Sequence, residues 1–265
     1  MPIPRPCDGG PVIDIRWLGH ATAVVDLGGA RLVTDPLLRR HVGALRRVGP
    51  APEPAWWGGA TASLVSHLHL DHTDLRSLRC LGDAPVLAGP EAAAWCARHG
   101  LASVALSDEW SAVSADHDDV EVRLVRADHT SRPLPGRPLE AYGFLLRHGP
   151  DVVWFAGDTS LYPEMGRLPE LAGGPISLAL LPIHGWGPRL SAGHMDAEQA
   201  ADAVQLSQAG RVVPIHWGTF HPLAMNLGSL DWMTRPLAAF EAAMERRGLA
   251  DRTLVLGVGQ TAQVG

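Results

Sequence analysis

Three histidines and an aspartate fall within six positions of the stretch SLVSHLHLDHTDLRSL, residues 63–78. The stretch opens with an apolar run that predicts a buried strand, so these polar side chains lie in a loop at a strand end, where folds often present functional groups. Strict alternation along an extended chain would place His67, His69 and Asp71 on one side and His72 on the other. Imidazole and carboxylate groups both bind zinc. We predict that His67 and His69 share one metal ion while Asp71 and His72 face a second.

Four donors from one loop cannot complete two metal coordination spheres, so the hypothesis requires further nitrogen and oxygen ligands at other strand ends. Three later apolar runs end in such residues, at His129, Asp158 and His216. Each of them taken alone is equally explained as a polar residue at a strand end, and a chance cluster is the corresponding alternative for the loop. Their succession along the chain favours a fold that brings these strand ends together.

The composition limits the chemistry of this site. All 22 cationic residues are arginine, and with 28 acidic residues the formal net charge is −6. An acidic chain lacks the basic surface that wraps a nucleic-acid backbone, so we expect no nucleic-acid partner. Cys7, Cys80 and Cys96 are far apart and form no CxxC pair, which argues against a disulfide framework and against a thiolate zinc site. Any metal must therefore be held by nitrogen and oxygen.

The remaining pattern predicts an α/β fold that is one domain over residues 1–265, because no linker or repeat interrupts it. Residues 12–34 alternate apolar and polar side chains around a Gly-Gly turn and predict antiparallel strands. The proline-rich residues 36–62 predict an irregular connection that lines a site. Further strands are predicted at residues 62–66, 85–89, 119–129, 140–149, 151–158, 176–183, 211–217 and 252–258, and helices at 90–100, 196–210 and 234–248.

These motifs resemble the metallo-β-lactamase fold superfamily, whose signature is H-x-H-x-D-H followed in order by a histidine, an aspartate and a histidine. The resemblance extends over almost the whole chain and implies a four-layer αββα sandwich. Four stretches are similar to the branch that contains ascorbate-6-phosphate lactonase and the phospholipase D that hydrolyses N-acyl phosphatidylethanolamine: IRWLGHATAVVDLGGARLVTDPLL, HLDHTDLRSL, FAGDTSLYPEM and VVPIHWGTFHP. Residues 127–131, ADHTS, lack the Pro-Gly-His-Thr-type turn of glyoxalase II and the β-lactamases, which disfavours those activities.

The resemblance also implies a ligand set and a reaction. The first metal would be held by His67, His69 and His129, the second by Asp71, His72 and His216, and Asp158 would bridge them. We expect two zinc ions, with manganese or iron as alternatives. The implied enzyme is a hydrolase whose bridging hydroxide attacks a small ester, lactone or phosphodiester, with Asp71 as the residue that orients the hydroxide and accepts its proton. The alternatives are a superfamily nuclease acting on RNA or DNA and a non-catalytic metal-binding protein.

Residues 180–199, LLPIHGWGPRLSAGHMDAEQ, place several polar side chains just before a predicted helix start, where anions are favoured. We expect an anionic small-molecule substrate, and we expect His194 to donate to this substrate and not to a metal. The alternative is that the loop carries ordinary surface polar residues. His20 and Asp35 are each either a turn residue or a partner of a ligand histidine. Roles also remain open for Arg132, His184 and His221.

No run of about 18 apolar residues and no basic, apolar leader occurs in the sequence. We therefore expect a cytoplasmic protein without a transmembrane segment, and the sequence does not predict its oligomeric state. The four arginines between the prolines of the irregular connection are expected to form the solvated face of a helix, with an anion site as the alternative. They are Arg39, Arg40, Arg46 and Arg47.

Overall fold

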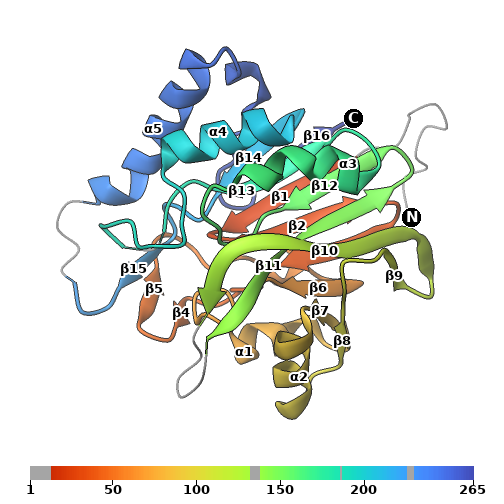
Figure 1. Ribbon diagram of the computed structural model, residues 1–265. Coiled ribbons are helices and arrows are strands. Elements are labelled where there is room, and N and C mark those ends of the chain that lie inside the picture. Colours follow the sequence, from red (N-terminus) through yellow and green to blue (C-terminus); the bar gives the residue numbers. More distant parts are fainter. Residues whose placement is uncertain (1–12, 132–137, 186, 226–229) are drawn as a thin grey trace, which may run out of the picture.

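The computed structural model describes residues 13–131, 138–185, 187–225 and 230–265, so Cys7, Arg132 and Trp186 lie outside the described residues. Two large β-sheets pack face to face, and helices cover the outer face of each sheet (Figure 1). The predicted α/β class and the αββα layer order are therefore confirmed.

The first sheet has seven strands in the order β16-β1-β2-β3-β6-β7-β8. Strands β1 to β3 are antiparallel neighbours, whereas β3, β6, β7 and β8 run parallel, so the carboxyl ends of the latter four meet at one edge. The strands are β1 (Ile13–Gly19), β2 (Thr22–Leu27), β3 (Ala30–Thr34), β6 (Ala62–Val65), β7 (Val86–Ala88), β8 (Ser103–Ala105) and β16 (Thr261–Val264).

The predicted closing strand at residues 252–258 is wrong, because the last strand is β16, which pairs with β1. Only one isolated bridge, from Thr253 to Val212, forms in the predicted segment. A turn at Gly259, with φ of 86°, then redirects the chain, and its N–H donates to the carbonyl of Trp17. Residues 252–258 have the more apolar sequence and were therefore predicted to form the strand. The strand that pairs with β1 is instead β16, whose apolar–polar alternation is weaker.

The second sheet has six strands in the order β14-β13-β12-β11-β10-β9. Strands β12, β13 and β14 are parallel, which brings the residues after β12 and β14 to the same edge. The strands are β9 (Ser111–Ser114), β10 (His117–Ser131), β11 (Leu139–His148), β12 (Asp151–Phe155), β13 (Leu178–Pro182) and β14 (Arg211–Ile215).

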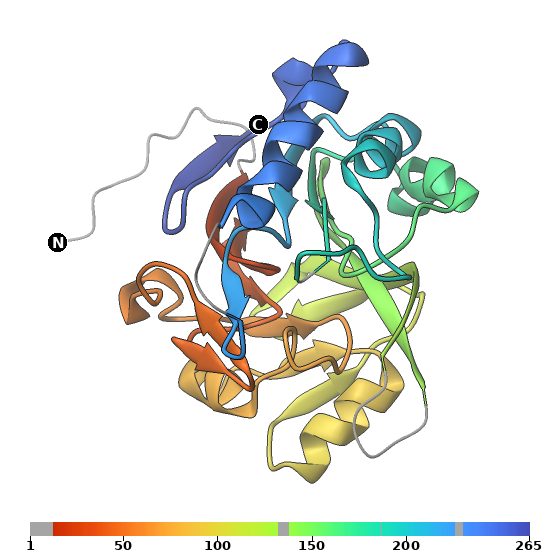
Figure 2. The same cartoon turned by 90° about the vertical axis from the view of Figure 1, so that its left-hand side faces the viewer.

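A third, three-stranded sheet lies at one side of the sandwich and joins β15 (Phe220–Pro222) to β5 (Leu45–Arg47) and β4 (His41–Val42) (Figure 2). The expectation of a solvated helix face for the four arginines of this region is wrong. A tight turn at Gly43 pairs β4 with β5, and β5 also pairs with β15, which leaves Arg47 only 2% exposed.

The helices divide between the two outer faces, with α1 and α2 against the first sheet and α3, α4 and α5 against the second (Figure 1). The capping box at the start of α4 forms as expected, since Asp196 accepts from the Gln199 N–H and the Gln199 side chain accepts in return. None of the described helices is long and apolar enough to cross a membrane. The helices are α1 (Leu75–Leu78), α2 (Pro90–Arg98), α3 (Leu168–Ala172), α4 (Ala197–Ser207) and α5 (Asp231–Arg246), with 3-10 turns η1 (Pro54–Trp56), η2 (Arg79–Leu81), η3 (Pro163–Arg167) and η4 (Ala250–Arg252).

The main core lies between the two large sheets and consists of the inward side chains of both. Ile15 and Leu64 from the first sheet pack in one buried cluster with Phe144, Phe155 and Val213 from the second. Burying apolar surface at roughly 25 cal/mol per Å² supplies the main driving force for this packing. This shared core holds the two sheets together, and the loops that carry the predicted site residues lie at their common edge.

Candidate metal centre

The histidine loop follows β6 and folds into a turn before α1. The N–H groups of His72 and Thr73 both donate to the carbonyl of His69, at 3.0 and 2.8 Å, and the Thr73 hydroxyl donates to the carbonyl of His67 at 2.6 Å. This turn breaks the strict alternation expected of an extended chain. Asp71 therefore groups with His72 and not with His67 and His69.

His67, His69 and His129 form one group of imidazoles. Nδ1 of His69 lies 3.0 Å from Nε2 of His67 and 3.2 Å from Nε2 of His129. Two nitrogens bound to one zinc at about 2.05 Å in tetrahedral geometry lie roughly 3.3 Å apart, so these separations suit a shared ion. The far nitrogen of His129, Nδ1, lies 2.8 Å from the carbonyl of Gly193, which orients the ring. Burial lowers the pKa of His129 to about 4, so the ring is neutral and able to bind metal.

Asp71, His72 and His216 form the second group, together with His20. Nε2 of His72 and Nε2 of His216 lie 3.0 Å apart, and Oδ2 of Asp71 lies 3.5 Å from Nε2 of His216. Two ring nitrogens that face each other at this distance gain little from direct contact, but they are well placed to bind one cation. Both groups that the loop was predicted to supply are therefore present.

Asp158 lies between the two groups. Its Oδ2 is 3.0 Å from Nε2 of His72 and 3.9 Å from Nε2 of His67, and its Oδ1 is 3.2 Å from Nε2 of His216. Oδ1 is buried and accepts no hydrogen bond of acceptable geometry from the described residues, which leaves a carboxylate oxygen available to a cation. Gly157, with φ of 61°, makes the turn after β12 that presents Asp158; a Cβ there would lie 2.9 Å from the carbonyl of Tyr142.

Asp35 is buried behind both groups of candidate ligands; it contacts His72 directly and His67 through Ser66. Its Oδ2 lies 2.6 Å from Nδ1 of His72 and accepts from the Ser66 hydroxyl at 2.6 Å, and its Oδ1 accepts from the Ser66 N–H at 2.8 Å. The Ser66 hydroxyl in turn lies 2.9 Å from Nδ1 of His67. Of the two readings left open for Asp35, the structure supports the contact with a candidate ligand histidine.

His20 also contacts the centre, which the sequence motif LGHAT indicated only weakly. Its Nε2 lies 3.1 Å from Oδ2 of Asp71, and its ring centroid lies 3.9 Å from that of His216. Burial lowers the pKa of His20 to about 3, so the ring is neutral. His20 was not among the predicted ligands, yet it belongs to the same donor group as three of them.

Charge organises this buried cluster. Burial raises the pKa of Asp158 and of Asp71, but the adjacent imidazoles of His216 and His72 outweigh burial and hold both carboxyl pKa values well below their usual range. Burial lowers the pKa of His72 and of His216, but the charge of Asp158 prevails; it raises the pKa of His216 to about 9 and that of His72 well above its usual value. The carboxylates thus stabilise positive charge on the neighbouring imidazoles, and a bound metal cation can supply that charge in place of the imidazole protons.

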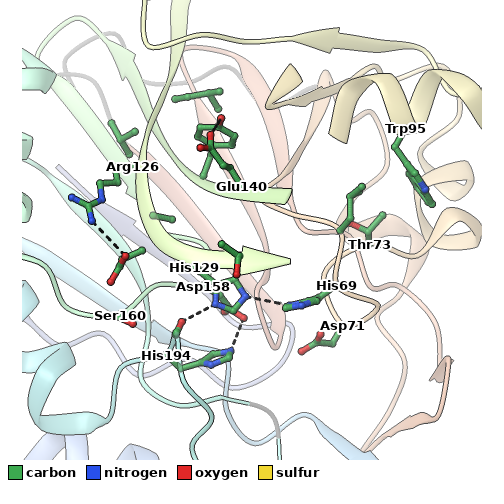
Figure 3. A pocket seen from close by; sticks show the side chains of 18 of the residues that line it. His69, Asp71, Thr73, Trp95, Arg126, His129, Glu140, Asp158, Ser160 and His194 are labelled. Carbon is green, nitrogen blue, oxygen red and sulfur yellow. Dashed lines mark hydrogen bonds and ion pairs between the residues drawn. The ribbon is translucent and has the colours of Figure 1, made fainter. Parts of the chain in front are cut away.

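His194 lies at the opening of the centre. Its Nε2 is 3.0 Å from Oδ2 of Asp158, its ring centroid is 4.9 Å from that of His129, and its Nδ1 is 3.0 Å from the Ser191 hydroxyl. Figure 3 shows His69, His129, Asp158 and His194 pointing toward one another across the pocket. His194 is close enough to serve either a metal or a substrate.

A cavity of about 1570 Å³ opens from the centre. It exceeds the 300 to 1,000 Å³ that is typical of small-molecule pockets, and its lining includes Val42, Ala44 and Leu45 of the connection that was predicted to line a site. Figure 3 shows Trp95, Arg126, Glu140 and Ser160 among the side chains that line it. Beyond the candidate ligands, the wall includes Leu45, Trp95, Leu106, Arg123, Arg126, Glu140, Tyr142, Ser160 and Leu171.

The other polar residues singled out in the sequence lie elsewhere. His184 lines a second, small pocket that also touches His20 and His216, and its Nε2 lies 3.2 Å from the carbonyl of Gly187. Arg189 is exposed, and His221 is 1% exposed with Nδ1 2.9 Å from the carbonyl of Pro222. These three side chains therefore do not converge with His194 on one anion site.

Backbone strain is concentrated at the centre. Four non-glycine residues in the described chain have positive φ, and three of them are His20 at 55°, Asp35 at 30° and His216 at 64°. Such conformations cost of order 1 kcal/mol or more each and persist where surrounding contacts fix them. Gln208, the fourth, ends α4 as a left-handed C-cap.

Comparison with known proteins finds relatives that are similar in sequence and solved structures that are similar in fold. It is 32% identical over 214 residues to a UPF0173 metal-dependent hydrolase of Pyrobaculum arsenaticum, covering 78% of this chain and 85% of the relative. It is 30% identical over 220 residues to an uncharacterized protein of Mycobacterium tuberculosis, of whose length the match covers 59%.

Solved structures with the same fold include Igni18, a metallo hydrolase of Ignicoccus hospitalis, with a TM-score of 0.71, 21% identity and coverage of 95% of this chain and 98% of that one. The isothiocyanate hydrolase from Delia radicum gut bacteria has a TM-score of 0.70, 16% identity and coverage of 96% and 98%. The family model described as the beta-lactamase superfamily domain matches residues 30–217. The chain therefore belongs to the beta-lactamase superfamily.

Proposed function

We propose that the protein is a metal-dependent hydrolase with a binuclear zinc centre that cleaves a small ester, lactone or phosphodiester. The observation that supports this proposal is the position of Asp158 between two groups of imidazoles: its carboxylate lies 3.2 Å from His216 of the second group and 3.9 Å from His67 of the first. The Pyrobaculum relative, which is called a metal-dependent hydrolase, supports the reaction class.

The donor set favours zinc, with manganese or iron as alternatives, because neutral imidazole and carboxylate groups suit these ions and neither described cysteine belongs to the donor groups. The first ion would be held by His67, His69 and His129 and the second by Asp71, His72 and His216, with Asp158 shared. Two such ions, when bound, activate a water molecule and stabilise the negative charge that develops on the attacked group.

The protein's own residues complete the chemistry. Asp71 is the proposed acceptor for the proton of the attacking water, and His20, 3.1 Å from its Oδ2, fixes the orientation of this carboxylate. His194 stands at the cavity wall and is the proposed donor to the substrate oxygen that becomes negative. We expect a small-molecule substrate that is anionic at the group held near His194.

The test is a panel of chromogenic lactones, carboxylic esters and phosphodiesters, offered to the zinc-loaded protein and to Asp158→Asn. We expect turnover of at least one class by the wild type, abolished by chelation, and loss of metal together with activity in Asp158→Asn, because a neutral amide bridges two cations poorly. Asp26→Asn is the matched control, since this carboxylate pairs with Arg31 at 35% exposure, away from the candidate ligands. Full activity of Asp158→Asn with full metal content would refute the proposal.

A further inference from the structure

Arg47 is a buried cation that the proposed reaction does not use. Its side chain is 2% exposed, and in the described part of the chain no ion pair joins it to a carboxylate. We propose that Arg47 is a positioning residue that holds the backbone around His20 and Asp35 and thereby shapes the site formed by Asp71, His72 and His216. This inference rests on the proposed binuclear function.

The guanidinium group joins two chain segments that flank the centre. Nη1 donates to the carbonyl of Leu18 at 2.7 Å, and Nη2 donates to the carbonyl of Leu37 at 2.5 Å. Leu18 lies two residues before His20, and Leu37 lies two residues after Asp35. One planar cation therefore fixes the distance between the two strand ends that carry the residues behind the second group of ligands.

A third segment, which follows His216, is attached to the same strand. Phe220 packs under the Arg47 guanidinium at 4.8 Å and meets the His20 ring edge-on, with centroids 5.5 Å apart. The N–H of Val48 donates to the carbonyl of Thr219, whose hydroxyl accepts from the N–H of His20 at 2.7 Å. The three strained residues of the centre thus all lie on segments that Arg47 or its strand contacts.

The two ends of this arrangement reach the candidate ligands directly. His20 lies 3.1 Å from Asp71, and Asp35 lies 2.6 Å from His72. A shift of either segment therefore moves a ligand of the second site directly, whereas Asp35 reaches His67 of the first group only through the Ser66 hydroxyl.

The free-energy cost of burying the Arg47 guanidinium indicates that this side chain has a specific role. Burial lowers the pKa of Arg47 to about 10, and its Nε has no hydrogen-bond partner among the described residues. A buried cation without a counter-ion is expensive, and an apolar side chain would fill the space at lower cost. Gly19 accommodates the guanidinium, because a Cβ there would lie 2.7 Å from Nη1. The guanidinium is therefore retained despite the cost of burying it, because only a side chain with two separate N–H donors can bind both carbonyls at once.

The test compares Arg47→Met and Arg47→Lys with the wild type by stepwise zinc titration against a competing chelator. We expect Arg47→Met to weaken the second zinc about 10- to 100-fold, the usual loss when a partner behind a ligand is removed, and to weaken the first zinc less, because Asp35 reaches that group only through Ser66. Arg47→Lys keeps the positive charge but cannot donate from two nitrogens, so we expect an intermediate loss of affinity for the second zinc. This variant also provides the test if Arg47→Met does not fold. Cobalt absorption spectra check the geometry of each site.

Two controls separate positioning from ordinary destabilisation. Met244→Ala, in α5 and fully buried, lowers the stability of the fold at a remote site and should weaken neither zinc selectively. Arg46→Met changes the neighbouring, partly exposed arginine of the same strand and should have no effect. Equal zinc affinities in the wild type and both Arg47 variants, or an equal loss at both sites, would overturn the inference.

Hydrogen exchange of the metal-free protein tests the same idea without zinc. Arg47→Met should accelerate exchange in peptides that contain Gly19 to Thr22 and Asp35 to Leu38, and not in peptides from α2. If the wild type binds only one zinc, the binuclear function fails, while the exchange result still decides the role of Arg47. Unchanged exchange in both segments would contradict that role.

Discussion

Nδ1 of His72 lies 2.6 Å from Oδ2 of Asp35, and both side chains are completely buried. The carboxylate accepts the proton on Nδ1 and so directs Nε2 of His72 toward Asp158, 3.0 Å away. A partner of this kind fixes both the tautomer and the orientation of an imidazole ligand, and it makes the ring a stronger base toward metal.

Asp35→Asn should therefore weaken zinc binding about 10- to 100-fold while preserving the shape of the side chain. The amide can still accept a hydrogen bond, but it carries no charge to polarise the imidazole. Competition with a chromogenic chelator measures the affinity, and Asp26→Asn serves as the exposed control. Zinc affinity equal to that of the wild type would show that Asp35 is only a turn residue.

Zinc uptake should release protons, because the metal-free centre holds them on its ligands. The pKa of His216 is raised to about 9, so this ring is protonated at pH 7, and the pKa of His72 is also raised, whereas metal binds only neutral imidazole. We expect net proton release at pH 7, less of it as the pH rises above 9, and a zinc affinity that falls as the pH is lowered.

Calorimetry in buffers of different ionisation enthalpy measures this release. The observed binding enthalpy at pH 7 should change with the buffer in proportion to the protons released. An enthalpy that is the same in every buffer would mean that His72 and His216 are already neutral, and the proposed charge balance of the centre would be wrong.

His194→Ala should keep both metals and the fold while lowering kcat/KM roughly a hundredfold, as loss of one donor to a developing negative charge does. Zinc content and thermal unfolding are measured beside activity on the best substrate of the panel. Because His194 lies 3.0 Å from Asp158, loss of one zinc in this variant is the informative alternative. That result would make His194 a metal ligand, and unchanged activity would make it an ordinary loop residue.

Much of the fold and of the site followed from local pattern. The loop after β6 and the polar residues after β12 and β14 could be recognised because parallel strands bring their carboxyl ends to one edge. His129 was also found, although β10 continues to Ser131; a register shift between Arg126 and Thr130 frees its side chain to face the centre.

Other features depended on contacts that local pattern does not encode. The grouping of Asp71 with His72 was predicted, but the turn that produces it is set by backbone hydrogen bonds to the carbonyl of His69, which strict strand alternation does not predict. The burial of Arg47 depends on pairing between β5 and β15, which are separated by more than 170 positions, so four neighbouring arginines suggested a solvated face. The place of His20 beside Asp71 likewise needs the two loops to be juxtaposed in the fold.

The most direct test of the binuclear proposal is the zinc content of the purified protein after reconstitution and removal of free metal, measured by elemental analysis against the protein concentration. The position of Asp158 between His67 of the first donor group and His216 of the second predicts two zinc ions per chain at saturation. Saturation at one zinc per chain would contradict a shared Asp158 and the binuclear mechanism that depends on it.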